Sequence, residues 1–163
     1  MAISPQMQLK LDRINALIEK GYSVKTRHKN WFPILISPEG KVVNLFFKDK
    51  YFDDYLPGFS WIAFFFPFVF ATKIRDWKFF WFLGLTVFIL SIVEFIFDID
   101  SSTGSSIGIS MFYGSFYPLQ RWLFEKSNKE EIGTFFSLLL GLFLAIIACI
   151  PAVIIDSIKL KSF

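Results

Sequence analysis

Residues 59–97 hold two apolar runs, rich in Phe and Trp, on either side of one short basic stretch, KIRDWK. Soluble monomers rarely expose contiguous apolar patches on the scale that these runs would create. The composition agrees, because 54% of the residues are hydrophobic and the mean hydropathy is +0.51. We therefore expect an α-helical integral membrane protein.

Four apolar segments set the expected layout of residues 59–163. A spanning helix needs about 20 apolar residues, and 59–72 is shorter and contains Pro67. We expect 59–72 to be an in-plane or re-entrant aromatic helix. The segments 78–97, 105–120 and 133–155 are expected to span, although 105–120 is polar for a membrane helix.

Residues 1–50 have the pattern of a small α+β module. Apolar residues at 7, 11, 14 and 18 predict a helix over 6–20, with Ser4 and Pro5 at its start and Gly21 at its end. Alternation from Tyr22 predicts a strand, and two further strands flank a turn at 38–40. Residues 51–58 are expected to link this module to the membrane domain. The expected core pairs one helix face with the strands: Leu11, Ile14 and Ile18 on Ile34, Ile36, Val43 and Leu45.

Basic residues predict the orientation, because Lys and Arg collect on the cytoplasmic side of spanning helices. The N-terminus has no apolar signal-peptide core, so we expect residues 1–50 to be cytoplasmic. If 78–97, 105–120 and 133–155 cross, fifteen Lys and Arg lie inside and two outside. If 59–72 crosses and 105–120 stays inside, the counts are twelve and five. The charge rule favours three spans.

Small residues recur at helical spacing in two of the expected spans. Such residues let helix backbones approach closely in lipid. We expect the two stripes to face each other, and their members are Ser106, Ser110 and Gly114 in one span and Gly141, Ala145 and Ala148 in the other.

Few residues could carry chemistry. Glu94 is the acidic residue inside a clear span, which makes it a candidate for ion or proton movement. His28 is the only histidine and Cys149 the only cysteine, so the sequence offers no metal-ligand set and no catalytic constellation. We expect no cofactor and no nucleic-acid partner, since no basic cluster is dense enough to bind nucleic acid.

The aromatic run beginning at Phe59 resembles the opening of the HrgC-like group of small bacterial membrane proteins, a family of unknown function. That pattern runs Trp-x-Ala-Phe-Phe-Phe, a Pro, a short basic stretch and an aromatic residue. This chain has Trp61, Ala63, Phe64, Phe65, Phe66, Pro67, Lys73, Arg75 and Trp77 at the corresponding positions. It departs from the group at Phe66, where a glycine is common, and at Ile74, which splits the basic pair. The resemblance covers about residues 55–130 and implies no particular activity.

These observations predict a non-enzymatic protein of the bacterial inner membrane that binds a partner or senses the membrane. The expected partners are membrane lipids, a protein bound through residues 1–50, and a second copy of the chain. The alternative is a small channel or transporter component, in which Glu94 and the Ser-lined segment 105–120 border a polar path.

Overall fold

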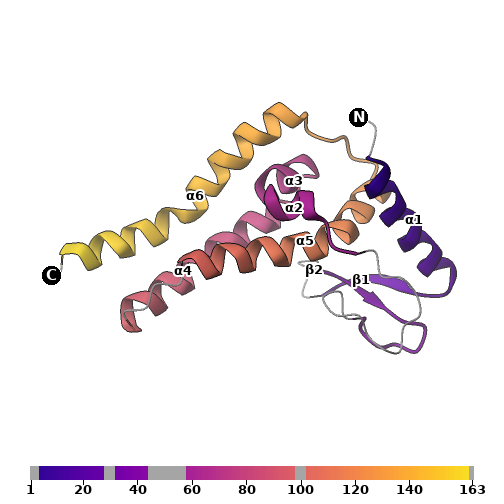
Figure 1. The fold of residues 1–163 in the computed structure, drawn as a ribbon, viewed down its shortest axis with the longest axis horizontal. Helices are drawn as coiled ribbons and strands as arrows, with labels where there is room; N and C mark the ends of the chain where they lie inside the picture. The colour runs from indigo at the N-terminus through magenta and orange to yellow at the C-terminus, as the bar shows by residue number, and fades with distance from the viewer. Residues whose placement is uncertain (1–3, 28–31, 44–57, 98–101, 162–163) are drawn as a thin grey trace. The chain divides into compact units, whose positions relative to one another are not determined.

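The computed structural model describes residues 4–27, 32–43, 58–97 and 102–161. The described elements, in chain order, are α1 (Pro5–Glu19), β1 (Ser23–Arg27), β2 (Phe32–Ile36), α2 (Trp61–Phe65), α3 (Pro67–Lys73), α4 (Trp77–Phe97), α5 (Ser102–Lys126) and α6 (Thr134–Lys161) (Figure 1). They divide into two units. The module unit is Met1–Ile62 with Gly114–Lys129, and the helical unit is Ala63–Tyr113 with Glu130–Phe163.

Helix α1 begins and ends where the sequence predicts. The Ser4 side chain accepts a hydrogen bond from the Met7 backbone N–H at 3.3 Å, and Pro5 occupies the first turn. Gly21 follows the helix with φ +90°, a conformation that glycine adopts without strain. The predicted helix over 6–20 is confirmed.

The sheet of the module unit pairs β1 with β2 in antiparallel register, with Val24 opposite Leu35. The predicted turn at 38–40 is confirmed by hydrogen bonds that close it between Ser37 and Lys41. Beyond the turn, Val42 forms an isolated bridge with Ile36. The rest of the predicted third strand, including Leu45, lies outside the described residues, as do residues 51–57 of the predicted linker.

The core of the module unit corrects two predictions. It is built from Ile14, Leu17, Leu35, Val43 and Leu119. On β2 the buried residues are Pro33 and Leu35, whereas Ile34 and Ile36 are half-buried. The expected face was wrong by one residue, and a one-residue shift reverses every side chain of a strand.

The second correction concerns the boundary of the module, because Leu119 of α5 is fully buried in this core. Beside it, the Trp122 indole N–H donates to the Asn15 side-chain oxygen at 2.8 Å. Residues 114–129 therefore complete a module that was predicted to end at residue 50, and the predicted membrane domain 59–163 is divided between the two units.

In the helical unit, the predicted helix at 59–72 is interrupted. Helix α2 ends at Phe65, and α3 starts at Pro67, whose ring cannot continue a helix from the preceding turn. Helices α4 and the Thr134–Ile155 part of α6 are long and apolar enough to cross a membrane. Helix α5 is 25 residues long but does not meet that criterion, so among the described residues two of the three predicted spans are candidates by length and composition.

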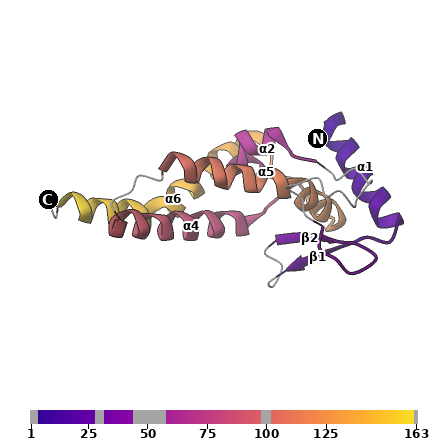
Figure 2. The same cartoon turned by 60° about the horizontal axis from the view of Figure 1, so that its bottom comes forward.

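Helices α4 and α6 run in the same direction (Figure 2). Near its start α6 places Gly141 against Phe68 and Thr72 of α3, and further on it places Ala148 against Gly84 of α4. The first half of α5 runs the opposite way along α4. The Phe112 ring lies 4.9 Å from Phe82, and the Tyr113 ring lies 4.4 Å from Phe79.

Candidate functional site

The predicted small-residue stripe on α6 lies at close helix contacts, with partners other than those expected. A Cβ atom on Gly141 would lie 2.8 Å from the Phe68 carbonyl oxygen, so this position has room only for glycine. Ala148 meets Gly84, where an added Cβ would lie 3.2 Å from the Ala148 carbonyl oxygen. Ala145 is half-buried. Gly141 and Ala148 of this stripe therefore pack against α3 and α4.

The predicted stripe on α5 does not form one contact surface. Gly114 belongs to the module unit, where an added Cβ would lie 2.7 Å from the Phe59 ring. Its carbonyl accepts the Ser60 backbone N–H at 2.9 Å. Ser106 is exposed and Ser110 half-buried. Gly114 and Gly141 thus contact different segments, and the two stripes do not face each other as expected. The spacing of small residues predicts that a helix is closely approached, but it does not identify which segment approaches it.

Lys10 of α1 binds the segment that precedes α2. Its ammonium donates a hydrogen bond to the carbonyl of Phe59, and the next residue, Ser60, donates its backbone N–H to the Gly114 carbonyl. Burial, followed by the charge of Arg13, lowers the pKa of Lys10. Gly114 and Lys10 thus hold Phe59 and Ser60 within the module unit.

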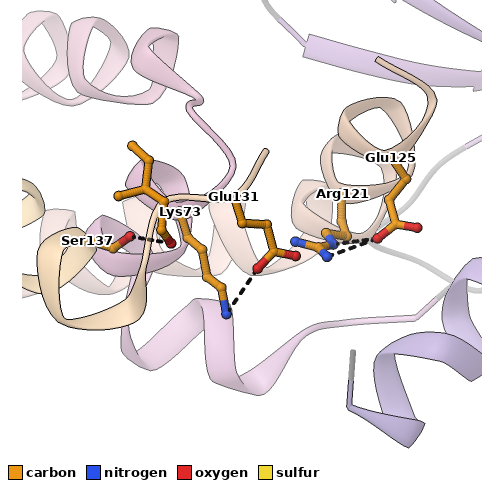
Figure 3. Close-up of polar contacts among 6 residues, drawn as sticks. Lys73, Arg121, Glu125, Glu131 and Ser137 are labelled. Atoms are coloured by element: carbon orange, nitrogen blue, oxygen red, sulfur yellow. Dashed lines mark hydrogen bonds and ion pairs between the residues drawn. The ribbon is translucent and has the colours of Figure 1, made fainter. Parts of the chain in front are cut away.

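Two ion pairs fix helix ends, one in each unit (Figure 3). In the helical unit the Lys73 ammonium lies 3.5 Å from the Glu131 carboxylate, and the Lys73 carbonyl accepts the Ile132 N–H. The buried Ser137 hydroxyl donates to the Ile132 carbonyl at 3.3 Å. In the module unit the buried Arg121 contacts Glu125 through two nitrogens, at 2.9 and 3.1 Å.

The turn between α3 and α4 places a charged residue in an unusual conformation. The Asp76 N–H donates to the Ala71 carbonyl and the Arg75 N–H to that of Thr72, which is the hydrogen-bond pattern of a Schellman motif. Arg75 therefore has φ +55°, where glycine is the usual residue.

Asp76, next in the chain, is half-buried. Burial raises the pKa of its carboxyl to about 6, against the opposing influence of Lys78 and of a backbone hydrogen bond with Phe79.

Two apolar grooves open on the helical unit. The larger, about 650 Å³, lies between α4 and α6 and includes Trp77, Trp81 and Leu85. The second, about 480 Å³, lies between α3 and the start of α6 and includes Phe70, Lys73 and Phe135. Both linings are almost entirely apolar.

The residues proposed for a polar path do not line either of these grooves. Glu94 is half-buried on α4 and Ser106 is exposed on α5. The arrangement of Glu94, Ser106 and Ser110 thus adds no support to the transport alternative.

Across the described ranges, no group of three or more His, Cys, Asp or Glu side chains could hold a metal ion. His28 lies outside those ranges, and Cys149 is half-buried with a free thiol. Comparisons of the chain with protein-family models, with curated proteins and with solved structures found no match, so its resemblance to the HrgC-like group remains a prediction.

Proposed function

We propose that this chain is a three-pass protein of the bacterial inner membrane. In this proposal α4 and the first part of α6 cross the bilayer, the chain returns between them along the first half of α5, and the module unit lies in the cytoplasm. The protein is non-enzymatic and binds a protein partner through its module unit.

The exposure of α4 and α6 supports membrane insertion. Their most apolar windows are only 22% and 17% buried. A core helix of a soluble protein would be mostly buried, and a signal sequence would lie at the N-terminus. Exposed side chains such as Trp81, Phe143 and Ile146 leave apolar surface that a lipid environment would cover.

The helix directions support three crossings. Because α4 and α6 run the same way, a chain that crosses with α4 must return before it crosses again with α6. Helix α5 runs antiparallel to α4 along Phe82 and Phe79. The part of α5 that lies in the helical unit, residues 102–113, accompanies α4 for about 18 Å of this return. The charge distribution of the sequence favours the same threading.

The continuity of α5 carries the proposed role. The first half of this helix belongs to the helical unit, and its second half supplies Leu119 and Trp122 to the module core. The module is thus built directly onto a membrane-associated helix. A protein of this design holds a folded binding surface at the membrane without needing catalytic residues.

Cysteine labelling tests the threading. On a Cys149→Ala background, Ser127→Cys and Ser157→Cys place single thiols on exposed residues after α5 and near the end of α6. With three spans, a membrane-impermeant maleimide added to intact cells labels Ser157→Cys and leaves Ser127→Cys unlabelled. If α4 and α6 crossed without α5, the labelling pattern would be reversed.

Photo-crosslinking tests the partner. A photoreactive amino acid replaces Leu9, an exposed apolar residue of the module unit, in the full chain in its native cells. We expect one discrete protein adduct, and none from the same probe at Ser157. Adducts to lipid alone, or the same adducts from both positions, would contradict partner binding through the module.

A further inference from the structure

We propose that the groove between α4 and α6 binds one acyl chain of an anionic phospholipid, whose phosphate is held by Arg75 and Lys78. This site rests on the proposed membrane insertion of α4 and α6. It gives a defined site and a head-group chemistry to the membrane lipids that the sequence predicts as partners.

The groove has the chemistry of a hydrocarbon site. Along α4 it is lined by Trp77, Trp81, Leu85 and Phe88. Helix α6 closes the other side, and the close contact of Gly84 with Ala148 joins the two helices along it. No charged side chain lines this groove, and nearly all of its surface is apolar, so a hydrocarbon chain is the ligand that would cover it best.

The length of the groove matches one leaflet. From Trp77 to Phe88 it follows α4 for about 16 Å, at 1.5 Å per residue. Half of a hydrocarbon core is about 15 Å. An acyl chain that enters beside Trp77 would therefore reach the middle of the bilayer, where the groove ends.

Along α4 and the turn before it, the basic residues lie at the Trp77 end. Lys78 follows Trp77, and Arg75 precedes it by two residues, so both α-carbons lie within about 8 Å of the Trp77 α-carbon. The nearby Lys73 is engaged by Glu131. Asp76 is the acidic residue of this turn, and its carboxyl is half-buried while Arg75 and Lys78 are exposed. The accessible charge at this end of the groove is therefore positive, which favours an anionic head group.

The conformation of Arg75 separates binding from folding. A glycine would fit φ +55° better than arginine, so Arg75→Gly removes a charge without straining the turn. A loss of lipid binding in this variant cannot then be assigned to a damaged fold.

Native mass spectrometry of the full-length protein, released from a delipidating detergent, tests the site. The probes are phosphatidylglycerol and phosphatidylcholine with identical acyl chains. We expect phosphatidylglycerol to bind at one saturable site and phosphatidylcholine at least tenfold more weakly. Arg75→Gly with Lys78→Gln should weaken phosphatidylglycerol binding about 10- to 30-fold, since each juxtamembrane charge contributes about a fivefold factor. Lys129→Gln, which removes an exposed charge elsewhere, should change little.

A second pair of variants tests the groove itself. Leu85→Trp fills it, whereas Leu142→Trp adds the same bulk to an α6 position of similar exposure, 50% against 53%, outside the lining. Only Leu85→Trp should abolish the saturable phosphatidylglycerol site.

Three results would overturn the inference, and each is visible in the same spectra. They are equal affinity for the two lipids, equal effects of the two Trp variants, and a dimer that Leu85→Trp dissociates in the absence of lipid. The last would assign the groove to a second copy of the chain. Failure of membrane insertion, measured separately by alkaline extraction of cell membranes, would overturn the proposed function as well.

Discussion

At the scale of single residues, the turn that joins α3 to α4 makes the sharpest predictions about stability. Arg75 has φ +55° in a position where glycine is usual, and the backbone hydrogen bonds on either side of it hold that conformation. Arg75→Gly should stabilise the protein by about 0.5–1 kcal/mol, because it relieves the steric cost of a Cβ at positive φ. Thermal unfolding in detergent measures this. Arg75→Ala keeps the Cβ and should not be more stable than the wild type. If it were stabilised as much as Arg75→Gly, the cause would be the lost charge and not the backbone conformation.

Asp76 predicts how stability depends on pH. Its native pKa of about 6 lies above the ordinary 3.8, so the native state holds this proton more tightly than the unfolded chain. Stability should therefore fall as the pH rises from about 4 to above 6. Asp76→Asn cannot ionise, so at pH 7.5 it avoids the cost of burying a charged carboxylate. It should then unfold at a higher temperature than the wild type, with a free energy of unfolding greater by at most about 3 kcal/mol. At pH 4 the two proteins should be alike. A constant difference at both pH values would exclude titration of Asp76 as the cause.

At the scale of elements, the contact between α3 and α6 depends on one glycine. Gly141→Leu would drive a side chain into the Phe68 backbone, which lies 2.8 Å from the position of the new Cβ. Overpacking of this kind typically costs about 1–3 kcal/mol. We expect a lower unfolding temperature in detergent. Leu139→Phe changes an exposed α6 side chain and should be tolerated, and the opposite ranking would mean that α6 presents its other face to α3.

The limits of the helices were predicted from the sequence more accurately than the segments against which the helices pack. Periodicity and the caps at Ser4 and Gly21 gave the limits of α1, and apolar length gave α4 and α6, because these signals are local. The buried face of β2 was misassigned, because Pro33 and Leu35 alternate with two equally apolar isoleucines and only packing against the rest of the module core decides between the two faces. The partners of Gly114 and Gly141 depend on tertiary contacts that spacing cannot specify.

At the scale of the whole molecule, α5 was the segment that local signals described least well. Its composition suggested a polar span at 105–120, yet its second half belongs to the module core. Leu119 and Trp122 meet Ile14 and Asn15 across more than a hundred residues of sequence. Contacts between residues so far apart produce no periodic pattern in the sequence. For this reason the module was predicted to end at residue 50.

This long-range core predicts that residues 1–50 do not fold alone. Leu119→Ala removes a fully buried side chain and should cost about 2–5 kcal/mol, enough to open a small module. Hydrogen exchange in nanodiscs reports this through the Val43 amide, which donates to the Leu35 carbonyl at 2.8 Å. We expect Val43 to lose protection in Leu119→Ala and in an isolated fragment of residues 1–50.

The matched control is Ile146→Ala, which shortens an exposed α6 side chain in the helical unit and should leave the Val43 amide protected. If Val43 stayed protected in the fragment, the module would be an independent domain and α5 would merely cover it. A binding event at the module could then occur without involving α5. If protection requires Leu119, residues 1–50 and the second half of α5 fold together, and neither can be removed by cleavage or truncation without unfolding the other.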